Sequence, residues 1–288
     1  MTEAERKQII ALVQREVVPA IGCTEPIAVA LCVAKATETL GAKPEKIDVL
    51  LSANILKNAM GVGIPGTGMI GLPIAIALGA LIGKSEYQLE VLKDCNPAAV
   101  EEGKRFIGEK RIDISLKKNI TEKLYIEVCC KSGGNKATAI IAGGHTTFIY
   151  IARNGDVLLN KQSAGCGEEE AQVAGLTLRK VYDFAMNAPL DEIRFILETA
   201  RLNKAAAERS FDGNYGHGLG RMLRGNYEHK ILGDSVFSHI LSYTSGACDA
   251  RMAGAMIPVM SNSGSGNQGI SATLPVLVYA EELSLIHI

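Results

Sequence analysis

Between Ile112 and Lys161, the apolar residues of the chain recur at every second position, whereas on both sides of this stretch they recur at the spacing of a helix. Alternation with a period of two is typical of a strand that buries one face. The runs that carry it are Ile112–Lys117, Lys123–Cys130, Ala137–Ile141, Thr146–Ile151 and Asp156–Leu159. Asn154-Gly155 separates the last two, and this pair tolerates the positive φ of a tight hairpin turn. The stretch therefore predicts antiparallel β-hairpins.

Helical spacing dominates the rest of the chain. Glu3–Val17 is amphipathic, and a second helix follows at Glu25–Leu40, with Thr24 as the expected N-cap residue. Further helices are predicted at Leu72–Ile82, Pro97–Ile107, Glu169–Met186, Leu190–Arg209 and in a segment that ends near Tyr243. Between the early helices, Ile47–Leu51 alternates as a strand and Asn54–Gly71 is expected to be an irregular loop.

This order of elements predicts an α+β fold, in which N-terminal helices with antiparallel β-hairpins are followed by a mainly helical region. We expect a mixed α/β region over residues 1–165 and a mainly helical region over residues 166–282. A short tail, residues 283–288, is expected to be non-native.

The uncharged stretch from Ala59 to Gly83 is long enough to cross a bilayer whose hydrocarbon core is about 30 Å thick. Pro65, Pro73 and several glycines would break such a helix, so we predict a buried core helix and no membrane span. The net charge of -1 offers no basic surface for nucleic acid. A small molecule is therefore the expected partner, and a homodimer is one of the oligomeric states that the sequence allows.

The chain has 7 cysteines, an odd number with no Cys-x-x-Cys pair and no secretory signal before them. These features favour reduced thiols and a cytoplasmic location. Cys23 differs from the others because it precedes a predicted helix, whose positive end should favour the thiolate that ligates metal. A buried or merely exposed thiol is an equally good interpretation of Cys23 from the sequence alone.

The densest chemical signal is the loop Ser261–Gly269, which is rich in Gly, Ser and Asn. Its glycines allow successive backbone N–H groups to turn toward one point, and its polar side chains add donors, so the predicted guest is a carboxylate or another small anion. The candidate binding residues are Asn262, Ser263, Gly264, Ser265, Gly266 and Asn267. A surface linker is the alternative, but the apolar run Ile270–Tyr279 that follows favours an ordered loop.

Two further residues are candidates for proton transfer. His145 lies between two strand runs, where a neutral imidazole can accept a proton near physiological pH. Lys57 lies in a polar loop ahead of the Gly-rich segment. The simpler interpretations are a histidine held in a turn and a solvated lysine.

Together these motifs resemble the L-cysteine desulfidase family, which is similar to the alpha chain of iron-sulfur L-serine dehydratase. The resemblance covers essentially all of the chain before its last residues. Its motifs are Gly22-Cys23-Thr24-Glu25-Pro26, Lys57-Asn58, Pro65-Gly66-Thr67-Gly68-Met69, Gly71-Leu72-Pro73, Gly143-Gly144-His145-Thr146, Arg194-Phe195-Ile196-Leu197, Asp249-Ala250-Arg251-Met252 and Ser261 to Gly269. The last two motifs are the most specific.

The resemblance implies a lyase that eliminates sulfide from L-cysteine, giving pyruvate and ammonia, with a 4Fe-4S cluster in place of PLP. It implies that three cysteines hold the cluster and that Cys23 is the first of them. His145 and Lys57 are then the candidates for proton transfer, and Asn262 to Asn267 for holding the substrate carboxylate.

The chain departs from this pattern because its relatives continue further and carry the other two cluster ligands in the additional portion. We therefore expect the chain to be C-terminally truncated and inactive by itself. L-Serine dehydratase with the same cluster is the nearest alternative, and a noncatalytic amino-acid-binding protein is the next. A PLP lyase is disfavoured, because the sequence has neither an evident Schiff-base lysine nor a doubly wound layout.

Overall fold

The alternating stretch forms most of a six-stranded sheet in the computed structural model, which describes residues 1–120, 122–161, 175–224 and 233–284. The strands follow the order β3-β2-β4-β5-β6-β7 across the sheet. Their bounds are β2 (Lys46–Leu51), β3 (Ile112–Leu116), β4 (Tyr125–Ser132), β5 (Asn135–Ala142), β6 (Phe148–Arg153) and β7 (Asp156–Asn160). Strands β4 to β7 are antiparallel neighbours, as predicted.

The first alternating run is not part of a hairpin. Strand β3 pairs with β2 in parallel, with Ile112 opposite Ile47, so the expected antiparallel pairing is wrong for this strand. Helices intervene between the two strands, and such a crossover connection returns the chain to the same end of the sheet and makes the pairing parallel. Strand β2 pairs with β4 on its other side, in the antiparallel sense.

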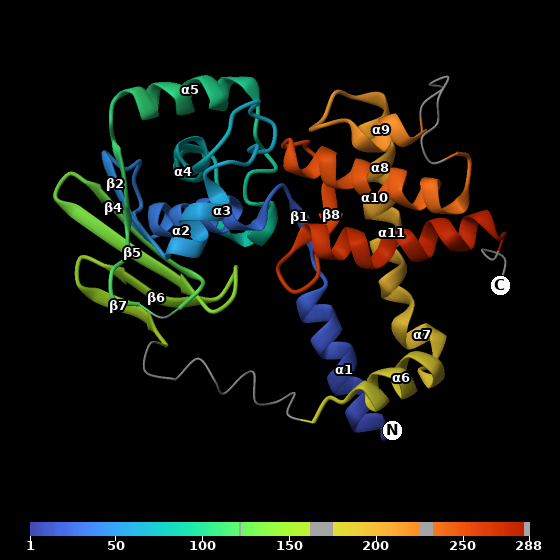
Figure 1. The fold of residues 1–288 in the computed structure, drawn as a ribbon. Helices are drawn as coiled ribbons and strands as arrows, with labels where there is room; N and C mark the ends of the chain where they lie inside the picture. The colour runs from blue at the N-terminus through green and yellow to red at the C-terminus, as the bar shows by residue number, and fades with distance from the viewer. Residues whose placement is uncertain (121, 162–174, 225–232, 285–288) are drawn as a thin grey trace.

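Three helices cover one face of this sheet in successive layers (Figure 1). Helix α2 (Thr24–Leu40) packs on β4 and β5, α4 (Leu72–Leu81) packs on α2, and α5 (Pro97–Gly108) packs on α4. A Cβ at Gly79 of α4 would lie 2.6 Å from the carbonyl oxygen of Ala30 in α2, so the two backbones are in close contact. Small residues allow this approach. The uncharged stretch is therefore a buried core helix, as predicted.

Among the described residues, no helix combines the length and the apolar character that crossing a membrane requires. Helix α4, the apolar part of the uncharged stretch, has 10 residues and is buried between α2 and α5.

The second half is helical and has a separate small core. Helices α8 (Leu197–Asp212), α9 (Leu219–Arg224) and α11 (Gly266–Glu282) all pack near α10 (Val236–Met252). The buried side chains between them are Ala206, Ala207, Ala247, Val259, Ile270 and Leu274. Shorter elements complete the chain: η1 (Ser85–Glu90), α6 (Leu178–Asn187), α7 (Leu190–Ile193) and η3 (Arg194–Ile196). The predicted fold class, α+β with a helical second half, is confirmed.

Several boundaries differ from the prediction. Ala53–Ala59 is a short helix, α3, inside the predicted loop, and α10 continues to Met252 instead of ending near Tyr243. The N-cap residue of α2 is Cys23 and not Thr24. In the helix expected over Glu169–Met186, residues 169–174 lie outside the described residues, and α6 begins at Leu178.

The first residues of the chain lie with its second half. Strand β1 (Pro19–Ile21) pairs with β8 (Pro258–Met260), and Ala20 is opposite Val259. The guanidinium of Arg6 in α1 (Glu3–Glu16) contacts the carboxylate of Glu192 in α7 at 2.6 Å, and Figure 1 shows α1 beside α6 and α7. The predicted boundary at 165 and most of the tail at 283–288 lie outside the described residues, so both stay predictions.

Candidate active site

Cys23 stands where the chain turns from β1 into helix α2. Gly22, before it, has a φ of 80°, and a Cβ at this position would lie 2.4 Å from the Cγ atom of Pro65. Only glycine satisfies both the backbone conformation and this contact. The side chain of Cys23 is buried, and its thiol donates a hydrogen bond to the Oε2 atom of Glu25 at 2.9 Å.

The environment of Cys23 favours the thiol over the thiolate. Burial raises the pKa of Cys23 to about 11, Arg251 acts in the opposite direction and Glu25 adds to the increase. The prediction that the helix N-terminus would lower this pKa is therefore wrong. Removing a thiolate from water disfavours the ionised form, and this effect of burial is the largest influence on the pKa of Cys23.

Glu25 accepts hydrogen bonds from two segments of the chain, the start of α2 and the end of α3. Its carboxylate accepts hydrogen bonds from the Cys23 thiol, from Thr24 Oγ1 at 3.1 Å and from Asn58 Nδ2 at 3.4 Å. Burial by itself would raise the pKa of Glu25, but hydrogen bonds from Cys23, its own backbone N–H and Thr24 outweigh burial and leave the pKa lowered. Glu25 is therefore a half-buried carboxylate that stays ionised at neutral pH.

The loop after β8 is a tight turn that is tied to the start of the chain. The backbone N–H of Asn262 and that of Ser265 each donate to the other residue's carbonyl oxygen, and Ser263 and Gly264 between them have φ values of 48° and 74°. Ser263 N–H donates to the carbonyl oxygen of Glu16. Ser265 is the N-cap residue of α11, where its hydroxyl accepts from Gln268 N–H. Several N–H groups of the loop thus already have acceptors within the chain.

His145 lies against this loop. It occupies the connection between β5 and β6, as predicted, and a Cβ at Gly264 would lie 2.4 Å from its Nδ1 atom. Burial lowers the pKa of His145 below its ordinary value of 6.5, while nearby Glu25 acts to raise it. The imidazole is therefore neutral at physiological pH, which is the form that accepts a proton.

Arg251 of helix α10 approaches the loop from the other side. Its side chain is buried, with 4% of the residue exposed, and Nη1 donates to Asn267 Oδ1 at 2.9 Å and to Met252 Sδ at 3.4 Å. A Cβ at Gly266 would lie 2.2 Å from Arg251 Nε, so the missing side chain of Gly266 makes room for the guanidinium.

These groups surround one polar cavity of about 240 Å³. Three separate parts of the chain supply its lining: the start of α2, the end of α3 with the segment after it, and the junction of α10 with α11. The lining residues are Cys23, Thr24, Glu25, Asn58, Val62, Arg251, Met252, Ser265 and Asn267. His145 is not among these lining residues, but it lies against Gly264, which precedes the lining residue Ser265, and it is close enough to Glu25 and Arg251 for both to influence its pKa.

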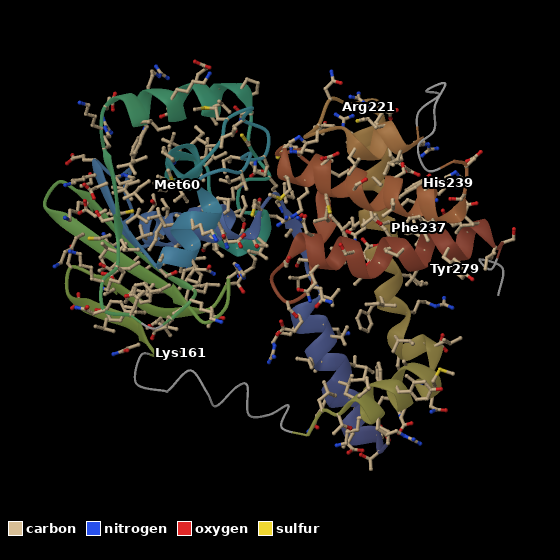
Figure 2. All side chains as sticks on the ribbon, in the orientation of Figure 1. Met60, Lys161, Arg221, Phe237, His239 and Tyr279 are labelled. Carbon is tan, nitrogen blue, oxygen red and sulfur yellow. The ribbon has the colours of Figure 1, made fainter. Side chains whose placement is uncertain are left out.

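The predicted residues are only partly gathered here. Cys23, Ser265 and Asn267 line the cavity, and Gly264 and Gly266 contact its neighbouring side chains. Lys57 is exposed on α3 and is not among the lining residues. Met60, which directly follows this helix and is labelled in Figure 2, is exposed as well. Ser263 is exposed at the tip of the turn, and Asn262 contributes to a different, larger cavity.

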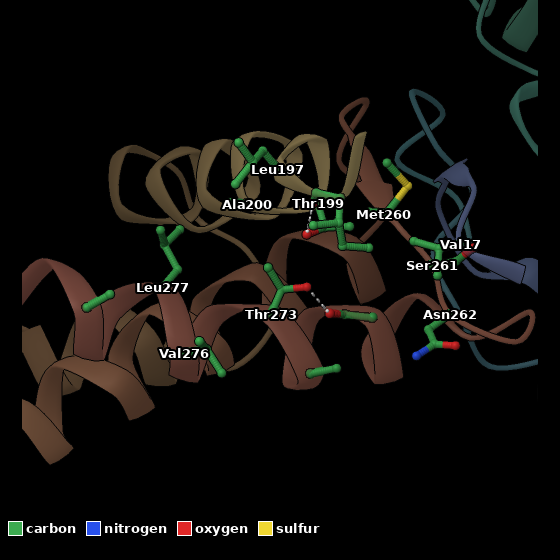
Figure 3. A pocket seen from close by; sticks show the side chains of 14 residues that line it. Val17, Leu197, Thr199, Ala200, Met260, Ser261, Asn262, Thr273, Val276 and Leu277 are labelled. Carbon is green, nitrogen blue, oxygen red and sulfur yellow. Dashed lines mark hydrogen bonds between the residues drawn. The ribbon is translucent and has the colours of Figure 1, made fainter. Parts of the chain in front are cut away.

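That larger cavity, of about 380 Å³, lies between α8 and α11 (Figure 3). Its lining is mainly aliphatic, with Leu197, Val276 and Leu277 among the contributing side chains. Thr199 and Thr273 also line it, but their hydroxyls donate to backbone carbonyls. This cavity therefore offers packing surface and few groups that could perform acid–base chemistry.

Sequence reasoning missed three residues of the polar cavity, Glu25, Asn58 and Arg251, as functional side chains. All three belong to motifs of the family resemblance, which was the available signal. Within the described residues, no group of three or more His, Cys, Asp or Glu side chains is arranged to hold a metal ion. The predicted ligand Cys23 is the sole cysteine among the residues that line this cavity.

Comparison with known proteins identifies the relatives of this chain. Residues 86–286 match the sequence profile described as the serine dehydratase alpha chain. A UPF0597 protein of Bacteroides fragilis is 82% identical over 282 residues, which are 98% of this chain and 66% of that protein. A UPF0597 protein of Bacteroides thetaiotaomicron is 78% identical, over 98% of this chain and 66% of that protein. One of Porphyromonas gingivalis is 51% identical, over 100% of this chain and 68% of that protein. The chain thus spans 66% of the length of the first of these relatives. No solved structure matches it significantly.

Proposed function

Because the chain belongs to the serine dehydratase alpha chain family, we propose that it is the part of a lyase that eliminates the β-substituent of a small L-amino acid, L-cysteine or L-serine. One observation carries the proposal. The polar cavity gathers Cys23, Glu25 and Arg251, with His145 close by against Gly264, and its volume of about 240 Å³ suits a substrate of this size. The odd number of cysteines, with no Cys-x-x-Cys pair, favours reduced thiols and therefore the cytoplasm as the site of the reaction.

The family is associated with an iron-sulfur cluster, and the described residues do not fit a complete cluster site. They place one thiol, that of Cys23, in the cavity, whereas the resemblance implies three cysteine ligands. Cys32 and Cys130 are buried in the core between α2 and the sheet. A 4Fe-4S cluster on this chain would need ligands from outside the described residues, and the steps below use only the chain's own side chains.

In the proposed reaction, a base removes the α-proton of the bound amino acid. The electron pair of that bond forms the Cα–Cβ double bond, and the β-substituent leaves with the pair of the Cβ bond. The aminoacrylate that remains is hydrolysed to pyruvate and ammonia. This is a general-base elimination, and such a base contributes roughly 10²- to 10⁴-fold to the rate.

We propose His145 as this base. It is neutral because burial lowers its pKa, and it lies against Gly264, next to the lining residue Ser265. Lys57 is kept as the second candidate for proton transfer, although its exposed position on α3 supports it less. The loop from Asn262 to Asn267 is proposed to form one side of the substrate site, since Ser265 and Asn267 line the cavity.

The test uses the complete protein, reconstituted under anaerobic conditions, with L-cysteine and L-serine as parallel substrates and pyruvate as the common product. We expect turnover of at least one substrate. Release of sulfide or its absence then separates desulfidase from dehydratase. Amino-acid binding with no pyruvate from either substrate would instead favour a noncatalytic binding protein.

The role of His145 is tested with His145→Asn in the same protein. We expect turnover to fall by roughly 10²- to 10⁴-fold, as for loss of a general base. Lys57→Met is the comparison, because it removes a charge from an exposed position. If turnover survives His145→Asn and is lost with Lys57→Met, the two candidate roles are reversed.

A further inference from the structure

Arg251 is a buried cation that no side chain in the described part of the chain neutralises. Its residue is 4% exposed, and among the described residues no carboxylate forms an ion pair with it. Its Nε atom is buried and has no hydrogen-bond partner within the same part of the chain. A buried charge without a counter-charge and a buried donor without an acceptor both destabilise a fold. Such an arrangement is therefore expected where a bound ligand supplies the missing partner.

The surrounding residues fix the guanidinium in position. Asn267 accepts from Nη1 at 2.9 Å, and the absence of a side chain at Gly266 leaves the space that the Nε edge occupies. Both residues lie in the first turn of α11, whose positive end would not attract a cation. The guanidinium of Arg251 and the positive end of α11 therefore lie together, and both favour an anion in this region.

Glu25 supplies the opposite charge in the same cavity. Its carboxylate is held by Cys23, Thr24 and Asn58, and it forms no ion pair with Arg251. The cavity thus keeps one cation and one anion apart, on α10 and at the start of α2. An α-amino acid carries the complementary pair of charges, a carboxylate and an ammonium group, at a short fixed separation.

We propose that the cavity recognises the zwitterion of its substrate, with Arg251 binding the α-carboxylate and Glu25 the α-ammonium group. The inference rests on the proposed function for the substrate class, an L-amino acid, and assigns these two charges to named residues. A guanidinium can donate two parallel hydrogen bonds to a carboxylate. The Gly-rich loop then acts chiefly by positioning Arg251, since the N–H groups of Asn262, Ser263 and Ser265 already donate within the chain.

The test determines whether binding depends on the carboxylate and on the ammonium group of the ligand. L-Serine is the probe, L-serinamide lacks the carboxylate, and 3-hydroxypropionate lacks the ammonium group. Calorimetry on the unmodified protein should give binding of L-serine, and at least about tenfold weaker binding of each truncated probe. Failure of L-serine to bind, or equal binding of all three probes, would overturn the proposal.

Substitutions then assign the two contacts. Arg251→Gln should abolish the preference for L-serine over L-serinamide and keep the preference over 3-hydroxypropionate, and Glu25→Gln should do the reverse. Arg221→Gln is the matched control, because Arg221 is an exposed arginine of the second half that lies outside the cavity. If the preference for the carboxylate survives Arg251→Gln, Arg251 does not bind it.

A stability measurement separates a role of Arg251 in ligand binding from a role in folding. If Arg251 is kept for a ligand, Arg251→Met removes a buried unpaired charge and should raise the melting temperature of the ligand-free protein by about 3 °C or more. A purely structural arginine would give the opposite shift. If the probe preferences change in the variants as expected but no pyruvate forms, the proposed lyase activity is contradicted and this inference is not. If pyruvate forms and Arg251→Gln leaves turnover unchanged, this inference is contradicted and the lyase activity is not.

Discussion

At the scale of single residues, two glycines of the loop after β8 make room for the side chains opposite them. Gly264 lies against His145 and Gly266 lies against Arg251, at separations that a Cβ could not occupy. The proposed base and the proposed carboxylate-binding residue therefore depend on the same turn. A substitution at either glycine should disturb the site even though glycine has no functional group of its own.

Gly264→Ala should destabilise the protein for two reasons. Its φ of 74° costs an alanine about 1 to 2 kcal/mol, and the new methyl group would displace His145. Gly134→Ala is the control, because Gly134 has a similar φ of 81° but no atom within 4 Å of a new Cβ. Chemical denaturation should show the larger loss for Gly264→Ala, with a shifted imidazole signal of His145 in NMR spectra. Equal losses and an unchanged imidazole signal would contradict the contact.

The lowered pKa of His145 makes a prediction about stability and pH. Below the ordinary pKa of 6.5, the unfolded chain binds a proton at His145 that the folded chain resists, so stability is lost as the pH falls toward the folded-state pKa. Between pH 8 and pH 5, His145→Asn should therefore lose less free energy of unfolding than the unmodified protein. Urea denaturation across this range measures the difference, and parallel curves would show that His145 is not buried in its neutral form.

The sequence revealed the site only in part, for reasons that belong to individual residues. Cys23 and His145 could be found because a thiol before a helix and a histidine between strands are distinctive by themselves. Arg251 could not be found in this way, because an arginine in a helix is usually solvated, and its burial depends on Gly266 and Asn267 of a different element. The pKa of Cys23 was predicted in the wrong direction because burial, unlike the helix end, cannot be read locally.

At the scale of secondary-structure elements, the pair β1–β8 is short, and Ser261 extends it. Both the N–H and the hydroxyl of Ser261 donate to the carbonyl oxygen of Val18, and Ser261 is fully buried. This contact connects the segment before Cys23 to the segment before the glycine loop. It therefore helps to hold together the two strands that precede two of the segments lining the cavity.

Ser261→Ala should lower the free energy of unfolding by about 1 kcal/mol, since the side-chain hydrogen bond is lost and the acceptor keeps only the backbone donor. Ser263→Ala should have little effect, because Ser263 is exposed and its hydroxyl donates only to the neighbouring Asn262 side chain. Urea denaturation of the two variants measures the difference. An equal effect of both substitutions would show that the Ser261 contact does not hold the strands together.

The elements with strong periodicity were predicted well, and those set by distant contacts were not. Helices α2, α4 and α5 and strands β4 to β7 follow the patterns of their own residues. The parallel partner of β3 depends on the crossover before it, and alternation carries no information about the direction of a neighbour. Helix α3 was missed because Asn54 and Asn58 are typical of loops, whereas packing buries Ile55 and Ala59 of the same segment.

At the scale of the whole molecule, there are two main cores. The pair β1–β8 joins them, together with backbone hydrogen bonds from Gly63 to Met252 and from Gly66 to Gly254. Ala20 of β1 is buried in the core of the sheet and its helices, and Val259, opposite it, is buried in the core of the second half. The polar cavity lies at the same junction, since its lining comes from both halves. Each half should therefore unfold partly independently of the other.

Ile126→Ala and Leu274→Ala test this organisation, because both side chains are fully buried, one in each core. Each change should destabilise its own half by about 2 to 5 kcal/mol. Hydrogen exchange should become faster in the sheet for Ile126→Ala and in α8 and α11 for Leu274→Ala. Uniform acceleration over all described residues in both variants would indicate a single cooperative unit.

The pairing of β1 with β8 also has a consequence for biosynthesis. Ile21 and Pro258 are partners whose positions differ by 237 residues, and at about 5 to 20 residues per second the ribosome needs roughly 10 to 50 s to make the intervening chain. During that time the newly made β1 has no strand beside it, while the sheet and its helices can already fold. The nascent chain thus emerges with Cys23 next to an open strand edge, and translation must pass the glycine loop before that edge is covered.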